Sequence, residues 1–454
     1  MNFFDELVIP PSENHVMLVK YMLTISLLLF IPYISMMLGA TFISTYYNRK
    51  GKNEKNSLYL RFAKDVVEKL TITKSAELAL GTIPALSTFF AYAQLLFMAK
   101  TVTIGMMALS VVLFIISFVF IYKYRNTFKL EGIMSAFKSF TSKDSLSKEN
   151  EEAEQIKEFE SANIKSNTTS GSIGKWLLLT AAYIFAGSMA LASNPDRWPH
   201  VNNVLQIIFS WQTIFSFGAL ITMAGIITGG AMMFYFFSWN GGVKHMTEEY
   251  AQLVRNTAGK IALASGILFP FFLMTTYAFM PQVTQSPTVF FYMVVVLIIT
   301  LVVGNFIYAM FKHNDTRSAA GVFMLVFVLV TFNIIKDQIA LGNAVHETTL
   351  EANKVATEEE KQVKSKTMES TGIDAQAIFN QKCSACHKFD VKLVGPPYQE
   401  TIPKYNGDVQ QLAEFIFNPV KKDPNYPPMP NQGLKKKEAT AMAQWLMDKV
   451  AGKK

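Results

Sequence analysis

Eight long apolar runs constrain this chain more than any other feature of its sequence. A helix needs about 20 apolar residues to cross a bilayer core of about 30 Å. Runs of about that length occupy residues 17–45, 76–99, 103–122, 175–193, 205–238, 260–280, 289–311 and 319–336, and none alternates with the period of two that barrel strands require. Charged residues make up 17% of the chain, against about 25% in soluble proteins. The sequence therefore predicts an all-α polytopic membrane bundle of about eight spans and argues against an ordinary soluble enzyme.

The basic residues between these runs predict how the bundle is oriented. Alternate connecting segments hold 22 Lys and Arg residues, whereas the other set holds only Lys100 and Arg197. Short loops rich in Lys and Arg stay on the cytoplasmic side. We therefore expect both termini on the periplasmic side of a bacterial inner membrane, with the first run retained as a helix. Much of the net charge of +8 then belongs to orienting residues, and no nucleic-acid partner is predicted.

Composition changes after the eighth run, which predicts a second domain. Residues 342–374 are rich in Glu, Lys and Thr and are expected to form a charged linker. Residues 375–454 carry their own aromatic residues and turn signals, which include Gly395-Pro396-Pro397. We therefore predict a membrane domain over 1–341 and a compact domain over 375–454. The long segment 128–174 inside the first domain is expected to be a solvated and partly disordered loop.

The only two cysteines form the most specific motif. Cys383-Ser384-Ala385-Cys386-His387 is a C-x-x-C-H sequence, in which two thiols attach a haem and the adjacent imidazole ligates its iron. A redox dithiol and half of a zinc site are the alternatives. No second zinc-ligand pair is present, and no βαβ pattern of a thioredoxin-like protein is visible. We therefore predict one covalent haem c on Cys383, Cys386 and His387.

A sixth iron ligand is expected downstream. Met429 stands between prolines in Tyr426-Pro427-Pro428-Met429-Pro430, which would hold its thioether in a rigid loop. Met442 and Met447 follow a helical pattern and are expected to pack in a core instead. The predicted iron ligands are thus His387 and Met429. No catalytic residue is predicted.

Residues 375–454 resemble class I cytochromes c. The resemblance rests on the C-x-x-C-H, the Val394-Gly395-Pro396-Pro397 turn, the Pro-Pro-Met-Pro loop and a closing helix with Trp445. It implies a small helical fold with one covalent haem whose two axial positions are filled, so oxygen chemistry at that iron is not expected. The 12 Lys against seven Asp and Glu in this region suit docking to an acidic redox partner, or simply a solvated basic face.

Titratable residues are sparse in the membrane runs. None of the six histidines lies in the middle of a run, so haem b ligation within the bundle is not predicted. Asp, Glu, Lys and Arg are expected only at the run ends, as with Lys336 and Asp337, which argues against a proton channel. Gly225, Gly229 and Gly230 are expected to form a close helix-contact face.

The membrane part also resembles the large subunit of cytochrome bd oxidases over about residues 15–280. The matching residues are Phe30-Ile31-Pro32 with Leu38-Gly39, Ala79-Leu80-Gly81, and the run from Ala224 to Met232. The departures are substantial. Leu27 stands where the family has a haem-ligating His, apolar residues near Leu220 replace another, and the turn from Met280 to Val289 is too short for the family's quinol loop. The resemblance implies a scaffold without the usual haem ligands.

These features predict an electron-transfer subunit of a respiratory membrane complex. Its partners would be other membrane subunits and a soluble or membrane-bound redox protein at the outer face. Whether the chain is itself an enzyme stays open. The alternative is a quinol:acceptor oxidoreductase that passes electrons from membrane quinol to the c haem, with His15, His200 or His346 as candidate proton acceptors. A transporter with an attached redox sensor is a third, weaker alternative, because its spans lack charges.

Overall fold

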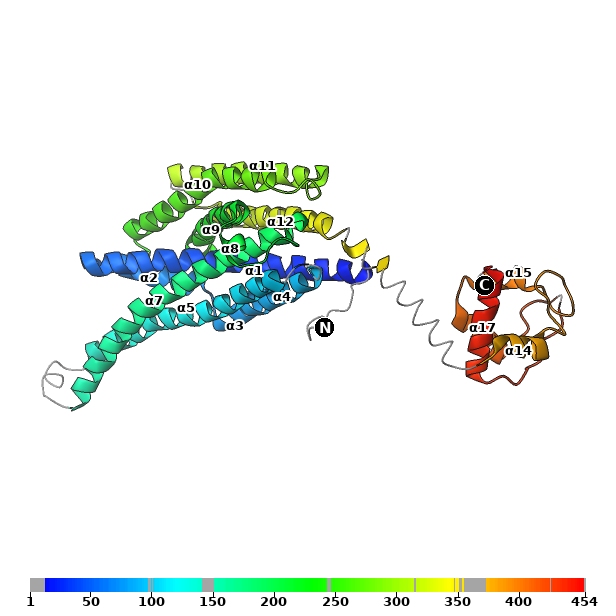
Figure 1. Ribbon diagram of the computed structural model, residues 1–454. Coiled ribbons are helices and arrows are strands. Elements are labelled where there is room, and N and C mark those ends of the chain that lie inside the picture. The colour runs from blue at the N-terminus through cyan, green and yellow to red at the C-terminus, as the bar shows by residue number, and fades with distance from the viewer. Residues whose placement is uncertain are drawn as a thin grey trace. The chain divides into compact units, whose positions relative to one another are not determined.

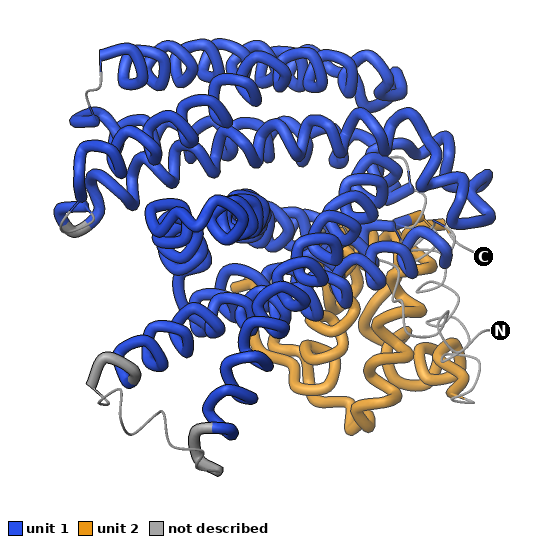
Figure 2. The backbone as a smooth tube through the Cα atoms, turned by 90° about the vertical axis from the view of Figure 1, so that its left-hand side faces the viewer, with its two compact units in different colours: residues 1–353 blue, residues 354–454 orange. Residues whose placement is uncertain are grey.

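The computed structural model divides the chain into two compact units. Unit 1 is Met1–Asn353 and unit 2 is Lys354–Lys454 (Figure 2). The structure describes residues 13–96, 99, 101–140, 151–242, 246–313, 316–346, 348–350, 353–354, 373–424 and 426–452. Within these residues the secondary structure is helical and contains no strand. The predicted fold class, a membrane helix bundle followed by a small helical domain, is confirmed.

Unit 1 contains the eight membrane helices that the apolar runs predict. Eight helical segments among the described residues are long and apolar enough to cross a bilayer. The helices that carry them are α1 (Glu13–Glu54), α3 with η1 and α4 (Lys74–Glu77, Leu78–Thr82 and Ile83–Leu95), α5 (Thr101–Phe140), α7 (Glu151–Ala192), α9 (Trp211–Phe237), α10 (Glu248–Ala278), α11 (Pro287–His313) and α12 (Ala319–Ala344) (Figure 1).

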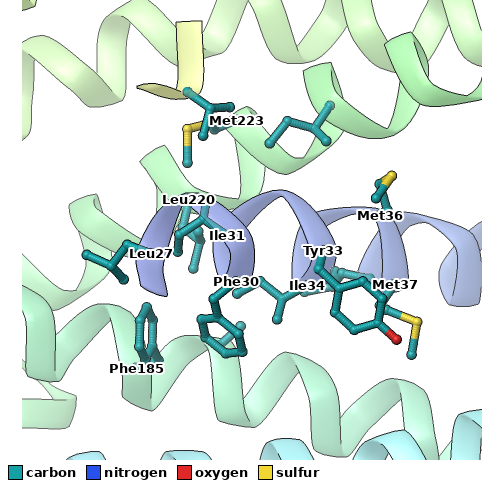
Figure 3. Close-up of a cluster of buried hydrophobic side chains, with 14 of the residues drawn as sticks. Leu27, Phe30, Ile31, Tyr33, Ile34, Met36, Met37, Phe185, Leu220 and Met223 are labelled. Atoms are coloured by element: carbon teal, nitrogen blue, oxygen red, sulfur yellow. The ribbon is translucent and has the colours of Figure 1, made fainter. Parts of the chain in front are cut away.

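Helix α1 lies at the centre of this bundle. It packs against α4, α7, α9 and α12, and most of its side chains from Leu23 to Ile43 are buried. Phe30 meets Phe114 of α5 and Phe185 of α7 edge to face, with ring centroids 5.1 and 5.5 Å apart. Figure 3 shows Phe30 and Phe185 below α1, with Met223 of α9 above it. Apolar contacts on several sides make α1 a core helix of unit 1.

Small residues let α9 approach its neighbours closely. A Cβ added to Gly229 would lie 2.6 Å from the Ala262 Cβ of α10, and one added to Gly225 would overlap the Ser265 side chain of α10. Gly230 faces Val326 of α12. The predicted contact face is therefore confirmed, and it packs within the chain. Close backbone approach through small residues is a common way in which helices associate in membranes.

The expected loop at 128–174 is largely helical, so that prediction is wrong in part. Helix α5 continues to Phe140 and α7 begins at Glu151, and only residues 141–150 lie outside the described residues. Three polar side chains join the extended helices: Asn48 of α1 donates to Asn167 of α7 at 2.7 Å, and Asn167 donates to Thr127 of α5 at 2.7 Å. The polar ends of these helices are joined by interhelical hydrogen bonds. Composition alone does not reveal such contacts.

The segment after α1 also folds back as a helix. Asn56 caps α2 (Ser57–Leu70) by accepting from the Leu58 N–H at 2.9 Å. Five residues of α2, Phe62, Ala63, Val66, Val67 and Leu70, are buried at helical spacing, so this amphipathic helix packs against α1 without spanning.

The prediction that charges stand only at span ends is wrong for Lys336 and Asp337. Helix α12 continues for two further turns beyond the predicted end and stops at Ala344, so both residues lie inside it. The Lys336 side chain is only 4% exposed, and its ammonium lies 3.1 Å from the Asp337 carboxylate. An ion pair neutralises both charges, which is how a buried lysine is tolerated. Arg255 of α10 is likewise buried and pairs with Glu248.

Unit 2 is a small helical domain with its own core. Its elements are α14 (Ala375–Ile378), η4 (Phe379–Cys383), α15 (Tyr398–Thr401), η5 (Ile402–Tyr405), α16 (Val409–Phe417) and α17 (Lys436–Val450). Asp374 and Asp408 cap α14 and α16, and Glu438 accepts from the Lys435 N–H at the start of α17. Helices α14 and α16 both pack against α17. The two compact units meet between Asn353 and Lys354. The predicted boundaries of the linker, at 341 and 375, stay predictions.

Candidate functional site

The C-x-x-C-H motif forms one tight turn at the end of η4. The backbone N–H groups of Cys386 and His387 both donate to the Cys383 carbonyl, at 3.1 and 3.0 Å. This turn buries Cys383 and leaves Cys386 half-buried, and both cysteines are free thiols. The two sulfur-bearing side chains and the imidazole therefore leave the chain within a single helical turn, which is what attachment of one planar ligand requires.

One backbone carbonyl and one aromatic side chain orient the imidazole of His387. Its Nδ1 lies 3.0 Å from the Pro396 carbonyl oxygen. Because a carbonyl can only accept, Nδ1 carries the proton and Nε2 keeps its lone pair for a metal. The ring also stacks on Tyr398, with centroids 5.0 Å apart. The imidazole is thus held in the ligating tautomer by the chain itself.

Gly395 is required for this arrangement. A Cβ at that position would lie 2.2 Å from the His387 Cε1 and 2.6 Å from its Nε2. The Gly395 N–H donates to the Cys386 carbonyl at 2.8 Å, which draws the two backbone segments together. The Gly395 turn therefore passes close to His387, and its closest contact is with the imidazole ring.

A cavity of about 580 Å³ collects the predicted site residues. Cys383, Cys386 and His387 line it together with Met429, so the four residues that the sequence selects surround one space. The lining also includes apolar residues, among them Leu412, Ile416, Leu434, Met442 and Leu446. An apolar cavity with two thiols, an imidazole nitrogen and a thioether offers the donor set of a haem site.

The two methionines of α17 behave as expected. Met442 is fully buried in the core and Met447 packs against it, both on α17. Trp445 of the same helix contacts Phe379 at 5.1 Å and Phe389 at 6.0 Å between ring centroids. This aromatic cluster fixes α17 against the turn that carries the cysteines.

Basic residues surround the cavity. Lys382, Lys404, Lys421 and Lys422 are among its lining residues, with two acidic residues, Glu400 and Asp423. The structure thus gives a location to part of the positive charge that the sequence could not place. A basic rim attracts an acidic partner surface and raises the association rate.

Burial tunes the ionisable groups beside the motif. It raises the pKa of the Cys383 thiol above its ordinary value, and the negative charge that Cys386 can carry adds to the shift, against a smaller opposing effect of Lys382. Burial also raises the pKa of Tyr398, so its hydroxyl stays protonated beside His387. Both groups are therefore neutral near pH 7.

The histidines of unit 1 do not join a comparable site. His15, His200 and His346 are exposed, and none lines the cavities found in the described residues. Nor does any group of three or more His, Cys, Asp or Glu gather to hold a metal ion within the described part of the chain.

The fold and the site define the class of unit 2: a cytochrome c domain. The cytochrome c family model matches residues 373–449. Cytochrome c-551 of Pseudomonas aeruginosa is 33% identical over 78 residues, which cover 16% of this chain and 75% of that protein. Cytochrome c-551 of Pseudomonas denitrificans is 35% identical over 82 residues (17% and 96%), and cytochrome c-552 of Hydrogenobacter thermophilus is 33% identical over 81 (17% and 82%).

Through this domain the chain belongs to the cytochrome c family. Electron transfer and haem c binding therefore follow for unit 2, next to a membrane-spanning helical region. The matches each cover 16% or 17% of this chain, so they describe unit 2 and leave unit 1 to physical argument.

Sequence reasoning missed two members of the site. Tyr398, which stacks on His387, and the Pro396 carbonyl, which sets its tautomer, were not selected. Both belong to the Gly-Pro-Pro-Tyr sequence after the motif, so an aromatic residue directly behind a rigid turn was the available signal.

Proposed function

We propose that this protein is the electron-transfer subunit of a respiratory membrane complex, carrying one covalent haem c. The observation that supports this most directly is the cavity in which Cys383, Cys386, His387 and Met429 meet. Cys383 and Cys386 would hold the haem through thioethers, and the His387 Nε2 and the Met429 sulfur would be its axial ligands. When bound, haem supplies one electron by cycling between ferrous and ferric iron.

The residues of this chain hold the site ready for that single-electron role. The Pro396 carbonyl keeps the His387 Nε2 available, and the buried wall of Leu412, Ile416 and Leu446 excludes water. With both axial positions filled by the chain, no site would remain for oxygen. The lysines around the cavity would orient an acidic donor or acceptor.

Unit 1 would anchor this site at the bacterial inner membrane. Its eight candidate spans and the uneven distribution of Lys and Arg support an orientation with both termini and unit 2 on the periplasmic side. One haem holds one electron, so a separate donor and acceptor are required. The long helices of unit 1 would then serve to bind neighbouring membrane subunits.

A pyridine haemochrome assay on the purified full-length protein tests this proposal. We expect about one c-type haem and no b-type haem per chain, and haem should stay attached after denaturation. The double variant Cys383→Ala/Cys386→Ala should lose the covalent haem, whereas Ser384→Ala, within the same turn, should keep it. Two or more b haems per chain would contradict the role of unit 1 as a scaffold.

A second candidate function is quinol:acceptor oxidoreductase, in which unit 1 supplies electrons to the haem. It is favoured by a cavity in unit 1 that is lined by the buried Lys336 and by its half-buried partner Asp337. Leu27 and Leu220, which stand where cytochrome bd oxidases would have haem ligands, line the same cavity. A bd-like ancestry with lost haem ligands would account for this apolar space.

A further inference from the structure

The cavity in unit 1 lies where six membrane segments meet. Its volume is about 140 Å³, and α1, α4, α7, α9, α10 and α12 all contribute lining residues. It lies toward one end of the bundle, because Asn194 after α7 and Phe279, Met280 and Pro281 after α10 close it. That is also the end at which α12 terminates.

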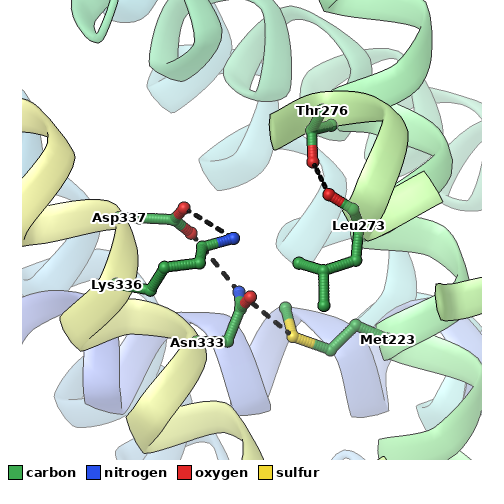
Figure 4. A network of polar contacts seen from close by, with 6 residues as sticks. All are labelled: Met223, Leu273, Thr276, Asn333, Lys336 and Asp337. Atoms are coloured by element: carbon green, nitrogen blue, oxygen red, sulfur yellow. Dashed lines mark hydrogen bonds and ion pairs between the residues drawn. The ribbon is translucent and has the colours of Figure 1, made fainter. Parts of the chain in front are cut away.

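One wall of this cavity is polar, and its charged groups and its amide come from α12. Lys336 and Asp337 form the ion pair at 3.1 Å, and the Asn333 Nδ2 donates to Asp337 at 3.3 Å and to the Met223 sulfur at 3.8 Å. Figure 4 shows the Lys336 amine and the Asn333 amide pointing toward the space opposite Leu273 and Thr276.

Two side chains on this wall have unused hydrogen-bonding capacity, Asn333 and Lys336. The Asn333 Oδ1 is buried and has no hydrogen-bond partner, in a residue that is 8% exposed. The Lys336 ammonium has three N–H donors and gives one to Asp337. A buried amide oxygen without a donor costs free energy, so a bound ligand that supplies one would be stabilised.

Most of the residues on the other walls are apolar, although Tyr92, Ser193, Gln212, Ser216 and Thr276 also line the cavity. Leu27 and Ile31 of α1, Phe185 of α7, Leu220 of α9 and Leu273 of α10 line them. An engineered cavity of about 150 Å³ with such walls accepts one benzene ring. The space in this protein is therefore the size of a single six-membered ring, with one donor and one acceptor at its polar side.

The net charge of the site argues for an uncharged ligand. Lys336 and Asp337 cancel, so the cavity has no excess positive charge to hold a phosphate group. A ring that carries carbonyl or hydroxyl oxygens fits both the size and the donor and acceptor positions, and an apolar tail suits the membrane around it.

The position of the cavity relates it to the haem site through chain topology. The chain leaves the membrane at the end of α12, and the segment that follows is too rich in Glu and Lys to cross a bilayer. A ligand in the cavity would therefore be bound near the membrane face from which the cytochrome domain extends.

We infer that this cavity binds the ring of a lipid-soluble quinone or quinol, with Lys336 donating to one ring oxygen and the Asn333 Oδ1 accepting from a ring hydroxyl. The inference deepens the second candidate function by giving its quinol a binding site. Oxidation of the bound quinol by the haem rests on that candidate function. Binding itself requires no electron transfer, so the two can fail separately.

Calorimetric titration of the reduced full-length protein with decylubiquinol, whose ring hydroxyls can both donate and accept, tests the site, since no electron moves between two reduced partners. We expect one binding site per chain. Asn333→Leu and the double variant Lys336→Met/Asp337→Leu should each weaken binding at least tenfold, as loss of a hydrogen bond in an apolar site does. The double variant leaves no unpaired charge, so it is expected to fold.

Matched variants outside the cavity control for general effects. Asn343→Leu on the same helix and Lys312→Met on α11 should leave the affinity unchanged, because neither residue lines the cavity. Size-exclusion profiles and haem spectra check that each variant is folded.

Three results would overturn the inference. The first is that decylbenzene, which has the ring and tail without oxygens, binds as tightly as decylubiquinol. The second is that both cavity variants keep the affinity of the parent protein. The third is that anionic phospholipid vesicles displace the quinol. If binding is intact but decylubiquinol does not reduce the haem, the site stands and the second candidate function fails.

Discussion

His387 and Met429 line the same cavity but are held by different means. A hydrogen bond to Pro396 and stacking on Tyr398 fix the histidine ring. Met429 is half-buried in a loop, and the prolines on either side restrict its backbone. The histidine side of the site is therefore determined by specific contacts, and the methionine side by chain stiffness.

Replacement of Met429 tests its role as the second iron ligand. The variant Met429→His should keep a six-coordinate, low-spin haem, but its reduction potential should fall on the order of 100 mV, because an imidazole stabilises ferrous iron less than a thioether does. Potentiometric titration of the full-length protein measures this change.

Met447→Leu is the matched control for that experiment. Met447 lies on α17 and packs against the core of unit 2, so its removal should leave the potential within a few tens of millivolts of the parent value. An unchanged potential in Met429→His would show that Met429 is not a ligand.

The chemistry of the site was largely predictable from sequence, but its geometry was not. Cys383, Cys386 and His387 are adjacent in the chain, so their association needed no knowledge of the fold. Met429 was selected by softness and by its prolines, and it lines the same cavity. The contact of Gly395 with the imidazole depends on a turn eight residues away, and periodicity carries no information about such contacts.

Among the helices, α9 depends most on small side chains. Gly225 and Gly229 lie against α10, and Gly230 lies against α12. A larger residue at these positions would separate the helices, since the neighbouring backbone is already close: the Ala258 carbonyl oxygen would lie 2.7 Å from a Cβ on Gly229.

Gly229→Val should therefore destabilise unit 1. We expect the free energy of unfolding to fall by about 1–3 kcal/mol from overpacking, seen as a lower melting temperature in mild detergent. Gly266→Val on α10 is the control, since a Cβ at Gly266 meets nothing within 4 Å. If the melting temperature falls equally in both variants, the cause is the β-branched side chain within a helix and not the contact with α10.

The apolar runs predicted the existence of the eight spans better than their ends. The prediction failed where a helix continues through polar sequence, as α7 does from Glu151 and α12 does to Ala344. There the helix is supported by side-chain contacts such as Asn48 with Asn167, or Lys336 with Asp337, between polar residues that a hydropathy pattern excludes.

At the scale of the whole molecule, the eight candidate spans among the described residues predict that Glu13 and Val450 lie on the same side of the membrane. Alkaline phosphatase, which is active only outside the cytoplasm, reports this side. A fusion after Val450 should be active, whereas a fusion in the basic turn at Lys55 should be inactive, as the distribution of Lys and Arg requires. Activity at Lys55 would show that the bundle is inverted.

The paired charges on α12 also limit how this protein can change over generations. Loss of Asp337 leaves the ammonium of the buried Lys336 without its counter-charge, at a cost of about 3–5 kcal/mol, whereas replacing both residues with apolar ones is often nearly neutral. Stepwise loss of Lys336 and Asp337 would therefore pass through a destabilised variant that has only one of the two substitutions. Descendants of this chain should keep both residues or lose both, so a lineage that abandons the cavity would show the two substitutions together.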